Sequence, residues 1–145
     1  MRLKGLIALS LALVMLVTLA TPALAGRPEK GVLTIYAPET ADTNNYSLQA
    51  THDNDIKVKV VLRGASPSTQ YVVLLFWGMG TGVPGNSVVL DNATTDERGN
   101  LRYVTKYPGW SPGTTRNFQL KLLRSPYVYP TDLAFVGQIE TFTFK

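Results

Sequence analysis

One stretch of the chain constrains the fold more than any other, because apolar and basic side chains fall on opposite parities along it. Apolar residues occupy every second position from Ile56 to Leu62, and Lys57, Lys59 and Arg63 fall on the alternate positions between and just after them. Successive side chains of a strand point to opposite faces, so this pattern predicts a strand between a core and water. After the first 25 residues no stretch keeps helical apolar spacing beyond two turns, whereas short β-branched and aromatic runs recur between turn-forming clusters. The chain therefore predicts an all-β domain.

The same pattern predicts about seven to eight strands, at residues 32–37, 46–50, 56–63, 71–77, 87–90, 101–107, 118–124 and 136–144. The run at 71–77 is apolar on both faces, which is typical of a central strand covered on its second face by a loop, a subunit or a ligand. In the last run Ile139 breaks phase with Phe142 and Phe144, so we expect a bulge near Glu140 or Thr141.

The N-terminus carries an export signal. Arg2 and Lys4 precede an apolar run that ends before Pro22, and the following Ala23-Leu24-Ala25 is typical of a cleavage site. We expect residues 1–25 to be a signal peptide and residues 26–145 to be the exported domain, located outside the cell, in a periplasm or on the cell surface. Two alternatives keep the segment uncleaved, as a membrane anchor or as the retained helix of a pilin-like precursor.

The charge of the expected exported chain limits its class of partner, and its lack of cysteine limits how it can be stabilised. Loss of Arg2 and Lys4 lowers the formal net charge from +4 to +2, so we expect no nucleic-acid partner. The chain has no cysteine, and an exported domain without disulfides must be stabilised by its core. A membrane partner is expected only if the N-terminal segment stays uncleaved.

Two motifs carry a family resemblance. The approach to the 71–77 run contains Pro67, Thr69 and Tyr71, and a later turn has the sequence Thr95-Asp96-Glu97-Arg98-Gly99-Asn100. Together they resemble the corner and turn of secreted bacterial and archaeal immunoglobulin-like modules related to fibronectin type III. The resemblance implies an immunoglobulin-like antiparallel β-sandwich in which the Tyr71 hydroxyl bonds a backbone group a few residues upstream. It implies no catalytic residue, and it holds at the level of the superfold because four possible strands follow the corner.

Rings beside loops are the candidate ligand-binding residues: Trp77, Tyr103, Tyr107, Trp110, Tyr127 and Tyr129. Aromatic rings stiffened by Pro and Gly can stack on sugars or anchor a protein partner at low entropic cost. The alternative for Trp110 is that it folds back and covers an open end of the sandwich. The glycine-rich stretch 78–86 is expected to be a mobile surface loop.

Other polar clusters predict turns rather than catalytic or metal sites. His52 is the single histidine and lies beside Asp53, and zinc would need more nitrogen or sulfur ligands than the chain offers. Two acidic clusters could contribute oxygens to calcium, although turn formation explains both, namely Asp53-Asn54-Asp55 and the set Asp91, Asn92, Asp96 and Glu97. Asn45 and Asn92 start glycosylation triplets.

These observations favour an exported, non-enzymatic module that binds a protein or polysaccharide of the envelope through its aromatic loops, without a cofactor. A structural subunit of a surface filament is the alternative, assembled by exchange of the strand near residues 31–37 or by a retained N-terminal helix. A hydrolase stays open as a third class, since paired carboxylates can lie in any set of loops.

Overall fold

The fold is all-β. The computed structural model describes residues 26–79, 82–126 and 131–145, and these residues form strands and turns but no helix. The strands are β1 (Glu29–Val32), β2 (Thr34–Ile35), β3 (Thr43–Ala50), β4 (Ile56–Arg63), β5 (Gln70–Met79), β6 (Asn86–Thr94), β7 (Leu101–Tyr107), β8 (Thr115–Arg124), β9 (Leu133–Val136) and β10 (Glu140–Thr143). The expected signal peptide lies outside the described residues. Within the described part of the chain, no helix has the length and apolarity needed to cross a bilayer.

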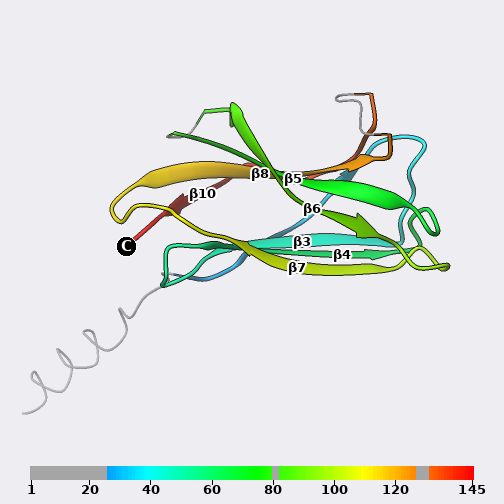
Figure 1. Ribbon diagram of the computed structural model, residues 1–145, viewed down its shortest axis with the longest axis horizontal. Helices are drawn as coiled ribbons and strands as arrows, with labels where there is room; N and C mark the ends of the chain where they lie inside the picture. Colours follow the sequence, from blue (N-terminus) through cyan, green and yellow to red (C-terminus); the bar gives the residue numbers. More distant parts are fainter. Residues whose placement is uncertain (1–25, 80–81, 127–130) are drawn as a thin grey trace, which may run out of the picture.

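Two antiparallel sheets face each other (Figure 1). Sheet A has the order β1-β3-β4-β7, and sheet B has the order β2-β9-β8-β5-β6 with β10 also paired to β8. The chain forms the β3–β4 hairpin in sheet A and the β5–β6 hairpin in sheet B, then returns to sheet A as β7 and to sheet B as β8. These returns place β7 beside β4 and β8 beside β5, so each sheet joins strands that are distant in sequence.

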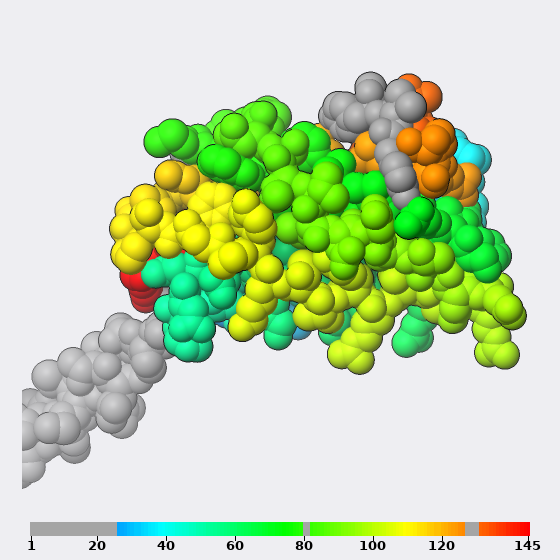
Figure 2. Space-filling model, in the orientation of Figure 1, coloured from blue at the N-terminus to red at the C-terminus, as the bar shows by residue number. Residues whose placement is uncertain are grey.

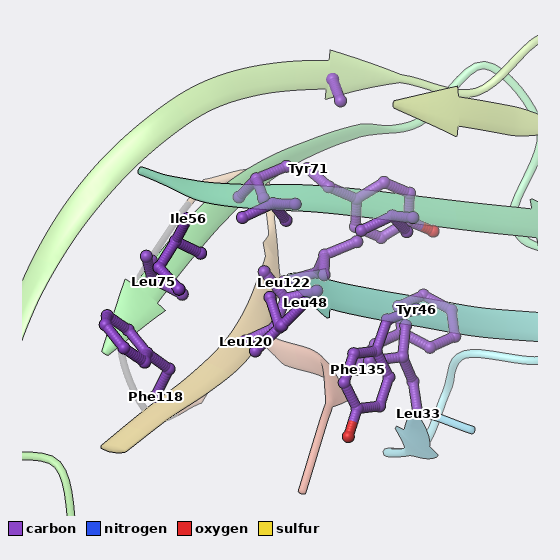
Figure 3. Packing of buried hydrophobic residues seen from close by; sticks show 14 of the residues in the cluster. Leu33, Tyr46, Leu48, Ile56, Tyr71, Leu75, Phe118, Leu120, Leu122 and Phe135 are labelled. Carbon is purple, nitrogen blue, oxygen red and sulfur yellow. The ribbon is translucent and has the colours of Figure 1, made fainter. Parts of the chain in front are cut away.

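The predicted alternation along β4 is confirmed. Ile56, Val58, Val60 and Leu62 are fully buried, and they meet the inward side chains of sheet B. Figure 3 shows this meeting at close range, where Ile56 lies near Leu75 of β5 and Leu48 of β3 near Leu120 and Leu122 of β8. The two inner faces therefore share one core.

The two end regions differ from the predicted strands. The expected strand at 32–37 is two strands, because Leu33 turns into the core at 1% exposure and sends β1 to sheet A and β2 to sheet B. The expected strand at 136–144 is likewise two strands, β9 and β10, which pair in succession with β8. The interruption lies at residues 137–139 rather than as a bulge at Glu140 or Thr141.

The cause of this interruption is a side chain from the opposite sheet. Gly137 donates its backbone N–H to the Leu120 carbonyl at 2.8 Å, and a Cβ there would come within 3.3 Å of the Tyr46 ring. The Tyr46 hydroxyl accepts from the Gln138 N–H at 3.2 Å and donates to the Glu140 carboxylate at 2.8 Å. One tyrosine of β3 therefore occupies the gap between β9 and β10.

Candidate functional site

The indole of Trp110 lies within an aromatic cluster at one end of the sandwich. Its ring centroid is 5.0 Å from that of Phe118, 5.2 Å from Trp77, 5.7 Å from Phe144 and 5.9 Å from Tyr107. The Trp110 and Phe144 rings stack at 17°, and the Trp77 and Phe118 rings meet Trp110 edge-on. This is the arrangement of rings that fill a core end, which is the alternative considered for Trp110 from the sequence.

Three further candidate rings, Trp77, Tyr103 and Tyr107, also pack against the core. Tyr103 is half-buried against the core, and burial raises the pKa of its hydroxyl. Trp77 and Tyr107 are also half-buried and pack on the core. Tyr127 and Tyr129 lie outside the described residues. The described candidate rings thus contact one another or the core, and none is among the large apolar side chains that the described surface exposes.

Tyr71 is fully buried and its hydroxyl donates to Glu39 Oε2 at 2.9 Å. The partner is a carboxylate from the connection between β2 and β3, whereas the resemblance implied a backbone group just upstream. The Ser66 hydroxyl donates to the same oxygen at 3.0 Å, and Arg124 Nε lies 2.6 Å from Glu39 Oε1. Burial, followed by the bond to Glu39, raises the pKa of Tyr71 to about 12.

Pro67 and Thr69 belong to the same corner. The Thr69 hydroxyl donates to the Pro67 carbonyl at 2.9 Å, and the Thr69 N–H donates to the Thr95 hydroxyl at 2.9 Å. The corner is thereby tied to the turn after β6. Nothing local in the sequence singles out Glu39 as the partner of this corner, since it lies in an irregular connection far from Tyr71 in the chain.

The acidic residues at 53–55 and 96–97 lie in turns, whereas Asp91 and Asn92 lie within β6, so the turn predicted for that pair is wrong. The Asp96 carboxylate accepts from the Arg98 and Asn100 N–H groups, each at 2.8 Å, and these bonds lower the pKa of Asp96. His52 and Asp53 lie 3.3 Å apart on an exposed turn. Among the described residues, no group of three or more His, Cys, Asp or Glu side chains could hold a metal ion.

The outer face of sheet A has a composition unlike the rest of the molecule. The register aligns Lys30, Ser47, Lys59 and Val104 in one row across the sheet. Because neighbours in a row point the same way and β4 buries its even-numbered side chains, the odd-numbered side chains of β4 face outward with this row. The basic side chains at outward positions define the basic face: Lys30, Lys57, Lys59, Arg63, Arg102 and Lys106.

No outward position of β1, β3, β4 or β7 carries a carboxylate. In Figure 2 this face lies along the lower border of the molecule, where long side chains project from sheet A. The sequence pattern indicated that Lys57, Lys59 and Arg63 face water. It could not indicate the convergence with Lys30 and Arg102, because that depends on the pairing of β1 and β7 with the same sheet.

A hollow of about 630 Å³ lies over part of this face. Its floor follows β3, whose outward side chains here are the short Thr43, Asn45 and Ser47. One wall comes from Lys30 and Val32 of β1, and the other comes from β4 through Lys59, Val61 and Arg63. We call this hollow the β3 trough. Two other hollows over the described residues are smaller, at about 370 and 340 Å³.

Comparison with known proteins adds no family. The chain matches no protein-family model, no curated protein and no solved structure.

Proposed function

We propose that residues 26–145 form an exported, non-enzymatic immunoglobulin-like module that binds an anionic partner of the cell envelope through the basic face. The observation that carries the proposal is the concentration of Lys30, Lys57, Lys59, Arg63, Arg102 and Lys106 on one sheet face whose outward positions hold no carboxylate. A single exposed ion pair contributes little, but several cations on one surface act together on a polyvalent anion.

The immunoglobulin-like assignment is supported by chain order. In such sandwiches strands B and E pair in one sheet and strands C, F and G form the other. Here β4 and β7 pair in sheet A, while β5, β8 and then β9 with β10 are neighbours in sheet B. The hairpin partner β6 takes the additional edge position beside β5.

The aromatic-loop route to a ligand loses support from the geometry. Trp77, Tyr107 and Trp110 stabilise one end of the sandwich through contacts with each other and with the core. A ring held edge-on or stacked by other rings has little free face for a sugar. The proposed binding surface is therefore a sheet face rather than a loop cluster.

The test measures binding of residues 26–145 to three immobilised polyanions, namely polygalacturonate, poly-glutamate and vesicles rich in anionic lipid. We expect saturable binding to at least one, weakened by salt as screening predicts. The double variant Lys59→Glu with Arg63→Glu should lose it. The matched control, Arg98→Glu with Lys145→Glu, reverses two exposed charges away from the basic face and should retain it. Equal loss in both double variants would mean that only net charge matters, and would overturn the proposal.

A second candidate function, a filament subunit assembled by strand exchange, is supported by the N-terminal segment. β1 pairs four residues with β3, β2 pairs two residues with β9, and Leu33 between them is the buried anchor. The same short segment from another copy could take this place. Light scattering at rising protein concentration distinguishes the two functions. Concentration-dependent oligomers that disappear in Leu33→Asp support exchange, and a persistent monomer counts against it.

A further inference from the structure

We infer that the β3 trough binds one chain of an acidic polysaccharide, with sugar carboxylates against its basic walls and sugar hydroxyls against its polar floor. The inference rests on the proposed function and names the ligand class of the same face. It follows from the shape of the trough, from the donors that line it and from what its surroundings exclude.

The shape comes from side-chain length. Outward residues of β3 are short, whereas Lys30 on one side and Lys59 and Arg63 on the other are long. Strands are about 4.8 Å apart, so the strands that carry the two walls lie about 10 Å apart with β3 between them. The lined part of β3, from Thr43 to Ser47, extends about 14 Å at a strand's rise per residue. The result is a narrow, elongated trough that is open above.

The donors suit a charged sugar. Lys30 and Lys59 stand in one row on opposite walls, with Ser47 between them. Asn45 and Thr43 continue the floor toward Arg63, which pairs in register with Thr43. The hydroxyl and amide groups can exchange hydrogen bonds with sugar hydroxyls, while the ammonium and guanidinium groups meet carboxylates, for which Arg offers a two-pronged fit.

Other anionic partners fit the trough less well. β3 is paired along its length with β4 and, from Asn45 to Leu48, with β1, so an acidic peptide cannot add as a strand to β3 along the trough floor. A flat bilayer would touch the walls but not the floor. The aromatic residue of the trough lining, Tyr46, directs its ring to the inner face, where its hydroxyl bonds Glu140, so it offers no stacking face for a nucleic-acid base.

The experiment fills the trough without changing its charge. Calorimetry measures the affinity of residues 26–145 for polygalacturonate, with neutral dextran, poly-glutamate, single-stranded DNA and anionic vesicles as further probes. We expect polygalacturonate to bind most tightly. Ser47→Tyr should weaken that binding about tenfold or more, which corresponds to a loss of at least one good contact. Val104→Tyr lies in the same row but outside the trough, and should leave the affinity unchanged.

Every result of this experiment either supports the inference or overturns it. Both variants count as folded if the unfolding temperatures of Ser47→Tyr and Val104→Tyr are close to that of the parent chain. If Ser47→Tyr then binds polygalacturonate as the parent does, or if poly-glutamate, DNA or vesicles bind more tightly, the inference is wrong. In that case the proposed function still stands, provided that Lys59→Glu with Arg63→Glu abolishes the binding observed. If no polyanion binds, both fail.

Discussion

At the scale of single residues, the buried carboxylate of Glu39 organises one corner of the sandwich. Its side chain is 1% exposed and receives the Tyr71 hydroxyl, the Ser66 hydroxyl and the Arg124 guanidinium. A buried charge needs compensation: two hydroxyls donate to Oε2 of Glu39, and Oε1 is ion-paired with Arg124. The corner thus joins the connection after β2, the start of β5 and the end of β8.

The buried tyrosines predict a loss of stability in alkali. An ordinary tyrosine has a pKa of 10.0, whereas native Tyr71 titrates at about 12. Burial, followed by the bond to Glu140, raises the pKa of Tyr46 in the same direction. Below about pH 10 both states hold these protons and the stabilisation is complete; above it the unfolded state loses them first, so the free energy of unfolding falls as pH rises.

Urea unfolding at about pH 8 and about pH 11 measures that fall. Tyr71→Phe removes one of the shifted groups, so the variant should lose less stability between the two pH values than the parent does. Tyr36→Phe, at an exposed ring, serves as the control and should behave like the parent. The prediction is wrong if Tyr71→Phe and the parent lose the same amount.

At Gly99, in the turn after β6, we expect a single added methyl group to lower the free energy of unfolding by an unusually large amount. Gly99 has a φ of +76°, and a Cβ there would lie 2.0 Å from the Ala65 carbonyl oxygen. Gly113 has a similar φ of +79° but open space around it, so it provides the matched control. Both changes to Ala incur backbone strain, and Gly99→Ala should lower the free energy of unfolding by about 1–3 kcal/mol more. Equal losses in thermal or urea unfolding would contradict the contact.

What the sequence could predict at this scale was local chemistry. Asp96 and Gly99 are recognisable as turn residues because the Asp96 bonds and the positive φ of Gly99 are local, whereas the close approach of Gly99 to Ala65 is not. Tyr71 is recognisable as a corner residue, but its partner Glu39 is not, because their contact spans 32 positions and depends on the path of the intervening chain.

At the scale of elements, strands that are fixed by their own pattern were predictable and strands that are fixed by their partners were not. β4 has the bounds predicted from its alternation, Ile56–Arg63, and β7 has the bounds predicted from a β-branched and aromatic run between turn residues, Leu101–Tyr107. In contrast, β1 and β2 form one extended segment that two different sheets divide between them at Leu33. β9 and β10 are separated by a side chain from the other sheet, a cause that no local pattern contains.

Because Trp110 packs among other rings at one end of the sandwich, we expect it to contribute to the free energy of unfolding. Trp110→Ala removes contacts with Trp77, Phe118 and Phe144 and should lower the free energy of unfolding by about 3 kcal/mol. It should also reduce the near-ultraviolet circular dichroism that arises from the close Trp77–Trp110 pair. Tyr36→Ala, at an exposed ring, should change stability by no more than about 0.5 kcal/mol. A Trp110→Ala protein as stable as the parent would return this ring to the candidate ligand-binding residues.

At the scale of the whole molecule, the distribution of charge matters more than its sum. The net charge of residues 26–145 is small. Taken alone, it argues against a strongly basic surface on this protein. The fold nevertheless collects basic side chains from β1, β4 and β7 on one outer face. The strand pattern therefore predicted which way Lys59 points, while the surface it belongs to emerged only from the sheet order.

The most direct test of this account maps the bound ligand residue by residue. Isotope-labelled residues 26–145 are titrated with a short galacturonate oligomer while backbone amide and indole N–H resonances are followed by NMR. The account predicts that the changes cluster at Lys30, Asn45, Ser47, Lys59 and Arg63, and that the indole signals of Trp77 and Trp110 stay in place. Changes centred on those indoles, with sheet A unmoved, would contradict it.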